Sequence, residues 1–505
     1  SVPYQPVPPL GQTLQRYLAA LEPLLPEDEL EHTRRIVQEF GCAGGLGESL
    51  QRELIKRAKH SHNWISDWWV QWAYLECRQP LAVHSNPAIS LPKRDFTDWR
   101  GQLVFASKLI AGVLNFKAEV DSGRLAIEYM RGNPLCMELF PKLFSSCRIP
   151  GPKHDLVVHY GRPRRGPAHI TVVRNYQFFQ LDVYNSDGTP LTESQIHAQL
   201  LRIRSQSWKT DKEPMGILTS EHRHTWGQAY TRLLRDKINK ESVRLIEKSL
   251  FTFVRAPLIP LPMPKKLYFY INSEIKWDLE MAKQNLDILI NDLDIKCFNF
   301  QCFGKKFVKQ LKLSPNSFVQ LAIQLAYYRV HNEVCAACDI ASLRMFRGGR
   351  TDYIRSPTNQ MLSFIQAFDD VAVSREAKIQ LLREAVNAYS LLTEQSLMGQ
   401  GIDRHLLGLK LQAIENGLSV PRIFMDTAYG LATHWKLRTG QVPTNTDSVM
   451  CFGPLVPDGY AVCYNPQQDH LHFSVTAFNC CEDTNAEKLA LTLERSLRDV
   501  QELFQ

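Results

Sequence analysis

The sequence predicts an α/β protein built from two domains. Segments with strand-like and helix-like patterns alternate along most of its 505 residues. A chain of that length exceeds what one hydrophobic core usually organises, so two domains are expected. Four prolines crowd residues 256–264, and proline interrupts both helices and central strands. We therefore expect an extended connector between the two domains at this point.

The chain before the connector predicts helices first and strands afterwards. Apolar residues recur at helical spacing up to Gly41, and a second helical region covers 47–78. Four tryptophans of that region are interpreted as core residues without a ligand role: Trp64, Trp68, Trp69 and Trp72. Runs of β-branched and aromatic residues then predict strands at 156–160 and 169–184. Helices are expected after them, at 193–205 and 225–250.

After the connector the alternation continues. We expect a strand, a helix, a strand and a helix at 267–271, 276–292, 295–302 and 315–331. A long amphipathic helix follows at 374–398. Three strand-like segments come next, at 448–456, 460–464 and 470–478. Thr484 and Glu487 have the spacing of a capping box, which predicts the start of the last helix.

Composition narrows the function classes. The net charge of +7 is small for this length; it suits an anionic small ligand and gives no argument for nucleic acid. Twelve cysteines show no secreted spacing, so we expect reduced thiols in an intracellular compartment. Cys335 and Cys338 form an isolated CxxC, which we interpret as core rather than as zinc or redox chemistry, and no metal is expected. No apolar run is long enough to predict a membrane span.

Common short motifs do not supply a function. The sequence has no phosphate-binding P-loop, no HExxH zinc motif and no GxSxG nucleophile elbow. No histidine is followed four residues later by an aspartate, as an HxxxD acyltransferase would require. Gly45 and Gly47 begin a GxGxxG pattern that lacks its last glycine and a preceding strand, so dinucleotide binding is not indicated.

Nine longer passages, in order along nearly the whole chain, resemble the carnitine/choline acyltransferase family and within it the acetyl-specific carnitine branch. They lie at 6–18, 144–155, 174–188, 216–220, 260–267, 303–315, 341–356, 403–415 and 452–466. The resemblance implies two α/β domains of chloramphenicol-acetyltransferase type, with mixed sheets flanked by helices. It also implies a helical start at 1–61 that belongs to the carboxyl-terminal domain, a truncated amino-terminal domain at 62–271, and a carboxyl-terminal domain at 272–505.

The family resemblance also implies a reaction. Acetyl-CoA, or CoA, and carnitine enter a tunnel between the domains from opposite sides as substrates, and no cofactor stays bound. A histidine acts as general base, and hydroxyl groups stabilise the oxyanion. We expect a monomer without nucleic-acid partners, placed in the mitochondrial matrix or the peroxisome. The last residues, 502–505, lack an S-K-L type peroxisomal address, which favours mitochondria.

For the CoA side, the resemblance assigns Lys305 and Lys309 to the nucleotide phosphates. On a helix their i, i+4 spacing places both on one face. The alternative is that these lysines are solvent-exposed surface residues without a ligand. The surrounding family motif favours the CoA assignment. Gln441 keeps a family glutamine that contacts CoA, whereas Asn316 and Ser390 replace a family aspartate and arginine at CoA-contacting positions.

For the carnitine side, the resemblance assigns Arg404 to the carboxylate and Thr351 to a supporting hydroxyl. A planar guanidinium can hold a carboxylate through two hydrogen bonds. The alternative for Arg404 is a salt bridge on a helix surface. Cys338 and Ile340 replace a family tyrosine and serine, so two polar groups are lost.

Three further positions concern the reacting groups. Gly440 stands where the family has an oxyanion-stabilising serine, and such a donor typically contributes about 2.7–4 kcal/mol. Arg438 replaces another serine and is expected to repel the trimethylammonium group of carnitine. Met450 matches the residue that closes the acyl pocket to all but short chains, with core packing as the alternative.

The largest departure is a segment that the family has and this chain lacks. The chain passes from Phe253 directly to Val254, where the family carries the catalytic histidine and several strands. His222 and His224 belong to another passage and are assigned to the surface. Loss of a general base typically costs a factor of about 10²–10⁴ in rate. Three interpretations stay open: an incomplete form of an active enzyme, a non-catalytic relative that binds CoA or a partner, and a product without a selected role.

Overall fold

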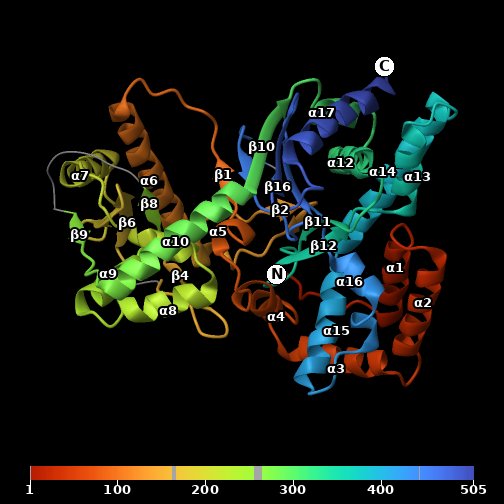
Figure 1. The fold of residues 1–505 in the computed structure, drawn as a ribbon, viewed down its shortest axis with the longest axis horizontal. Helices are drawn as coiled ribbons and strands as arrows, with labels where there is room; N and C mark the ends of the chain where they lie inside the picture. The colour runs from red at the N-terminus through yellow and green to blue at the C-terminus, as the bar shows by residue number, and fades with distance from the viewer. Residues whose placement is uncertain (1, 162–165, 255–263, 443) are drawn as a thin grey trace.

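The computed structural model describes residues 2–161, 166–254, 264–442 and 444–505. Helices and strands alternate along these residues, and mixed sheets are flanked by helices, which confirms the predicted α/β class. Figure 1 shows the two larger sheets in separate halves of the molecule. Helix α10 (Ser273–Asp292) runs from one half into the first strand of the other. The connector predicted at 256–264 lies outside the described residues, apart from Pro264.

The larger sheet has six strands. β13 (Leu437–Gln441) is parallel to both neighbours, β11 (Ala337–Ser342) and β15 (Tyr460–Pro466). The remaining pairs are antiparallel: β12 (Thr351–Arg355) lies beside β11, β16 (Leu471–Phe478) beside β15, and β10 (Leu293–Phe300) beside β16. Strand β11 therefore lies between β12 and β13, which brings residues from distant passages together.

The central strands of the six-stranded sheet are covered by helices and form a buried core. Every residue of β15 and β16 is buried, and α12 (Pro315–His331) adds an unbroken buried run from Ser317 to Tyr327. Helix α12 begins where it does because the Ser314 hydroxyl accepts a hydrogen bond from the Ser317 N–H, and Pro315 occupies the first turn. The cover is completed by α13 (Asn359–Phe368), α14 (Arg375–Leu397) and α17 (Ala486–Glu502).

The smaller sheet has four strands in the order β8, β6, β7, β9. Its centre is formed by β6 (His169–Arg174) and β7 (Gln177–Asp182), against which α6 (Trp99–Asp121) and α7 (Glu193–Gln206) pack. The edges are β8 (Thr252–Val254) and β9 (Lys265–Leu267). The described chain leaves this sheet at one edge and returns to it at the other.

The first helices pack far from the smaller sheet. α1 (Leu10–Leu21), α2 (Glu27–Gly41) and α3 (Leu46–His60) share a core with α15 (Asp403–Glu415) and α16 (Thr427–Thr433). Figure 1 shows these helices grouped below the six-stranded sheet. The domain boundaries at 61 and 271 stay predictions.

Shorter elements complete the fold. They are α4 (Ser66–Val70), the π-helix η1 (Gln71–Leu75), α5 (Leu81–His84), β1 (Ala88–Ser90), β2 (Tyr129–Met130), β3 (Asn133–Pro134), η2 (Phe140–Leu143), β4 (Ser146–Ile149), β5 (Leu156–His159), η3 (Met215–Ser220), α8 (Arg223–Leu233), α9 (Lys237–Lys248), α11 (Lys305–Gln310), η4 (Arg422–Phe424) and β14 (Val449–Cys451). Strand β14 pairs with β1 and not with either large sheet.

Several local predictions need correction. The helix predicted at 225–250 is two helices, because Asp236 caps a new one by accepting hydrogen bonds from the Ile238 and Asn239 N–H groups. The last helix is capped by Asn485, which accepts from the Lys488 N–H, and not by Thr484. The strands predicted to reach 271 and 456 end at Leu267 and Cys451.

Other local predictions are confirmed. Cys335 and Cys338 are both buried in the core. His222 and His224 are exposed. Among the helices of the described residues, none is long and apolar enough to cross a membrane.

Candidate functional site

A buried arginine between two aromatic rings is the centre of the candidate site. Arg404 is the second residue of α15 and is 2% exposed. Its guanidinium carbon lies 3.4 Å from the centre of the Trp69 ring and 4.5 Å from that of Tyr353. Stacking on both rings fixes the plane of the guanidinium group, because cation–π attraction is strongest over an aromatic face. Arg404 is therefore not a surface residue of its helix.

The hydrogen bonds of Arg404 leave one donor without an acceptor. Its Nη2 donates to the Thr351 hydroxyl at 3.4 Å, so the structure brings the two predicted carnitine residues together. Its Nε is buried and finds no acceptor among the described residues. A buried guanidinium donor without an acceptor is costly, and a ligand carboxylate would satisfy it.

A buried carboxyl group positions Arg404. The Asp352 Oδ1 atom accepts hydrogen bonds from the backbone N–H groups of Arg404, at 3.2 Å, and Tyr353, at 2.7 Å. Burial raises the pKa of Asp352 to about 7, although the positive charge of Arg404 opposes this shift. By contrast, the neighbouring Arg355 is already paired with Asp403 at 2.8 Å. Arg404 is thus the guanidinium of this region with a free donor.

Trp69 corrects the interpretation of the tryptophan cluster. Trp64 and Trp69 are buried as expected, but Trp69 also forms one wall of the Arg404 site, and Trp72 is exposed. Sequence reasoning missed this role because Trp69 and Arg404 are far apart in the chain. The close spacing of the four tryptophans pointed only to packing.

Three predicted CoA residues lie on helix α11 and on strand β13 of the six-stranded sheet. Lys305 and Lys309 are on one face of α11, as their spacing predicted if this segment is helical. Lys309 is exposed and Lys305 is half-buried. Gln441 is half-buried at the end of β13.

The two substituted CoA positions are occupied by internal hydrogen bonds. Asn316 donates to Asp339 at 3.3 Å and accepts from the Tyr464 hydroxyl. The Ser390 hydroxyl lies 2.8 Å from that of Ser317 and donates to a backbone oxygen of its own helix. The Asn316 side chain is therefore engaged with β11 and β15, and the Ser390 hydroxyl with α12 and α14.

Phe452 covers the positions of the altered oxyanion motif. Arg438 stacks its guanidinium 4.4 Å from the Phe452 ring centre and donates to the Gly453 carbonyl at 3.1 Å. A side chain at Gly440 would begin 3.3 Å from the same ring. The charge of Arg438 is thus partly engaged within the protein. Among the departed carnitine positions, Cys338 is buried and Ile340 is exposed.

Met450 lies in β14, opposite Ile89 of β1, and its carbonyl accepts a hydrogen bond from Ser474 at 2.6 Å. The next residue, Cys451, has its sulfur 3.8 Å from that of Cys297 in β10. The hydrogen bond from the Cys297 thiol lowers the pKa of the Cys451 thiol. Strand β14 therefore contacts the six-stranded sheet through Ser474, which bonds Met450, and through Cys297, which lies beside Cys451.

All fifteen histidines lie among the described residues. His405 is next to Arg404 in sequence, but its Nδ1 lies 2.6 Å from the Thr13 hydroxyl and its Nε2 lies 2.6 Å from the Gln51 side-chain oxygen. Burial lowers the pKa of His405 to about 3. It is a neutral structural imidazole. His84, on α5, is half-buried, and both burial and the charge of Arg438 lower its pKa. The charge of Arg438, a residue of the altered oxyanion motif, thus influences the protonation of His84.

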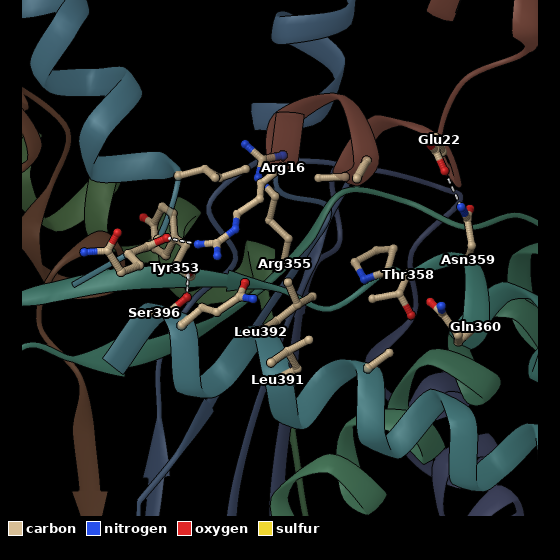
Figure 2. Close-up of a pocket in the computed structure, with 18 residues that line it drawn as sticks. Arg16, Glu22, Tyr353, Arg355, Thr358, Asn359, Gln360, Leu391, Leu392 and Ser396 are labelled. Atoms are coloured by element: carbon tan, nitrogen blue, oxygen red, sulfur yellow. Dashed lines mark hydrogen bonds between the residues drawn. The ribbon is translucent and has the colours of Figure 1, made fainter. Parts of the chain in front are cut away.

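A cavity of about 380 Å³ adjoins the Arg404 site, and sequence reasoning did not predict it. Figure 2 shows it between α1, β12 and α14, with Arg16 and Arg355 above Leu391 and Leu392. Tyr353 lines this cavity and also stacks on Arg404, so the two spaces share a wall. The cavity lining combines the apolar side chains of Leu391 and Leu392 with charged groups of both signs, Arg16 and Glu22 among them.

Comparison with known proteins places the chain in an acyltransferase family. The family model described as choline/carnitine O-acyltransferase matches residues 5–254 and 255–495, so the chain belongs to that family. It is 47% identical to carnitine O-acetyltransferase of Homo sapiens and 48% to that of Columba livia, each over 100% of this chain and 94% of the relative. Choline O-acetyltransferase of Danio rerio is 33% identical over 100% of this chain and 93% of the relative.

The chain is therefore more similar to these carnitine enzymes than to the choline enzyme, which confirms the predicted branch. A solved trichothecene 15-O-acetyltransferase from Fusarium sporotrichioides aligns over 46% of this chain and 54% of its own, with 11% identity and a TM-score of 0.28. That likeness is too low to add to the family assignment.

The alignments also show that the relatives have residues which this chain lacks. Comparison with the human enzyme extends over 586 positions, against the 505 residues of this chain, a difference of about 80 positions. The family model matches in two pieces that meet between Val254 and residue 255. This is one residue from the junction where the sequence analysis expected a missing segment.

Proposed function

We propose that this chain binds carnitine and CoA in a carnitine acetyltransferase-like site but does not transfer acetyl groups between them. The observation that carries the binding half is Arg404. A buried guanidinium with a free Nε, stacked between Trp69 and Tyr353 and supported by Thr351, has the geometry that a small carboxylate requires.

The proposal that acetyl transfer is lost rests on the lack of a general base and of an oxyanion donor. Attack by the carnitine hydroxyl or the CoA thiol needs a base that removes a proton. The segment that carries this base in the family has no counterpart here, and the histidine next to Arg404 has both ring nitrogens engaged. Gly440 offers no hydroxyl to an oxyanion. Both losses should lower the rate of the same transfer step.

The edge of the smaller sheet supports a missing segment at the same junction. Val254, the last described residue of β8, is 68% exposed. A cavity of about 370 Å³ lies beside it, lined by Phe96, Trp99, Leu103, Phe253 and Val254 among others. Exposed apolar side chains around the end of an edge strand are what remains when a sheet loses the strands that cover it.

The CoA half of the proposal is supported by Lys305 and Lys309 on one face of α11. CoA is proposed as a ligand of the substrate type and not as a resident cofactor. A mitochondrial or peroxisomal location is proposed from the family resemblance alone.

Calorimetry with carnitine tests the binding half. We expect the chain to bind carnitine, and Arg404→Ala to weaken that binding about 10- to 100-fold, since a charge-assisted hydrogen bond contributes about 1.5–3 kcal/mol. Arg404→Lys keeps the charge without the planar fork and should fall between. Arg422→Ala is the matched control, because Arg422 forms an exposed salt bridge with Glu39. Unchanged affinity in Arg404→Ala, or no heat with the folded wild-type chain, would contradict the proposal.

A second candidate function is residual acetyl transfer with His84 as the base. The observation that favours it is the half-buried position of His84 beside Arg438, whose charge helps to keep the imidazole neutral. A neutral imidazole is the form that accepts a proton. Turnover that His84→Ala abolishes would establish this alternative.

A further inference from the structure

Outside the Arg404 site, two imidazoles and a carboxylate converge at one point of the six-stranded half. The Nε2 atoms of His470 and His472 lie 2.7 and 2.8 Å from the same oxygen, Oδ1 of Asp447. The two imidazole rings are 4.9 Å apart and nearly perpendicular, at 87°. In the part of the chain that the structure describes, this is the single group of three side chains whose ligand atoms come within 4.8 Å of one another.

We propose that Asp447, His470 and His472 form a binding site for one divalent transition-metal ion of the zinc class. Two imidazole nitrogens and one carboxylate oxygen are a donor set that suits Zn²⁺, Co²⁺ or Ni²⁺ better than Mg²⁺ or Ca²⁺, which prefer oxygen. A water molecule would complete a four-coordinate shell. This site was not predicted from the sequence, because Asp447 lies in a loop and two strands, β14 and β15, separate it from the two histidines along the chain.

The distances fit a metal after a small adjustment. Tetrahedral zinc bound at about 2.0–2.1 Å holds its ligand atoms roughly 3.3 Å apart. The present separations of 2.7 and 2.8 Å must therefore open by about half an ångström. Asp447 can make this movement, because its side chain is more than half exposed.

The frame around the three side chains is rigid. His472 is a buried residue of β16, paired with Asn299 on one side and Asn465 on the other. The Asn465 side chain donates 2.9 and 2.8 Å hydrogen bonds to the carbonyls of Thr446 and Ser448, on either side of Asp447. The loop and the strand are thus already held together at the position where the ligands converge, which lowers the entropy cost of metal binding.

The site adjoins the two segments that the proposed function uses. The loop with Asp447 leads into β14 and Met450. The turn before His470 accepts the N–H groups of Lys305 and Lys306 on the carbonyls of Gln467 and Gln468, at 2.8 and 3.0 Å. A bound metal would therefore fix the loop before the acyl-pocket residue against the turn that supports the first residue of α11.

The test uses the whole purified chain, freed of metal with a chelator and kept reduced, and titrated with Co²⁺ or Zn²⁺. We expect one equivalent to bind, Co²⁺ to give the visible absorption of a four-coordinate nitrogen and oxygen site, and Zn²⁺ to raise the thermal midpoint. His472→Asn and Asp447→Asn should each weaken binding at least about tenfold. Asp447 is exposed, so its variant keeps the test valid if His472→Asn does not fold.

The matched control is His434→Asn. His434 forms a single 2.7 Å contact with Asp458, which resembles one half of the proposed site without the second imidazole. Metal binding should be unchanged in this variant. Absence of uptake by the folded wild-type chain would overturn the proposal. So would uptake that persists in both His472→Asn and Asp447→Asn, since the metal would then lie on other groups such as the cysteines.

Discussion

The two large sheets differ in how completely their strands are covered. In the six-stranded sheet, β15 and β16 are buried along their whole length and enclosed by α12 and α17. In the four-stranded sheet only β6 and β7 form a buried centre, and β8 is a three-residue edge with two exposed residues. The difference coincides with the junction of the two matched pieces of the family model. The closed half carries the residues that we propose as ligand contacts, whereas the open half contains the junction of the two matched pieces.

The largest expected effect is on backbone protection. Amides of β15 and β16 should exchange with solvent only through global opening, because no local opening leaves their core intact. Amides of β8 need only the loss of one short edge strand. We expect at least about a thousandfold slower exchange in β15 and β16, measured by hydrogen exchange with mass spectrometry. Equal protection in the two sheets would remove the contrast.

A pair of phenylalanines sharpens the comparison energetically. Phe473 is fully buried in β16 and stacks on Phe298 at 4.9 Å, so Phe473→Ala should cost about 3–5 kcal/mol in the free energy of unfolding. Phe253 of β8 is half-buried, and Phe253→Ala should cost about 1 kcal/mol. Denaturant unfolding of both variants gives the comparison. Similar costs would mean that the end of β8 is covered as well as β16.

Two buried carboxyl groups should give the halves opposite responses to pH. Burial raises the pKa of Asp352 to about 7, so the folded chain keeps a proton that the unfolded chain has lost. The free energy of unfolding should therefore fall as pH rises from about 4 to 7, by at most about 1.4 kcal/mol per pH unit from this group. In the other half, the pKa of Asp155 is lowered. Burial alone would raise this pKa, but hydrogen bonds from Arg148 and Arg223 outweigh the effect of burial. Its contribution is present above about pH 4 and lost as pH falls through its lowered pKa.

Unfolding measured across this pH range separates the two carboxyl groups. Asp352→Asn should remove the loss of stability between pH 4 and 7, and Asp155→Asn should lower stability at neutral pH by leaving three arginines without their shared carboxylate. A pH profile that Asp352→Asn leaves unchanged would show that Asp352 is ionised in the folded chain.

The sequence was enough to predict the α/β class, most of the elements and the pairing of Arg404 with Thr351. These follow from local periodicity and from passages that resemble the family. The walls of the site were not predictable, because Trp69 reaches Arg404 only through packing of distant helices. The stacking of Arg438 on Phe452 and the convergence of Asp447 with His472 depend likewise on sheet register, which no local pattern encodes.

The central claim is that binding survives while transfer is lost, and an acetyl-transfer assay tests it most directly. The folded chain is incubated with acetyl-CoA and carnitine near neutral pH, and acetylcarnitine is measured by mass spectrometry, with an active relative as positive control and His84→Ala alongside. We expect the wild-type chain to form no more acetylcarnitine than buffer does. Formation well above buffer, whether or not His84→Ala abolishes it, would contradict the account.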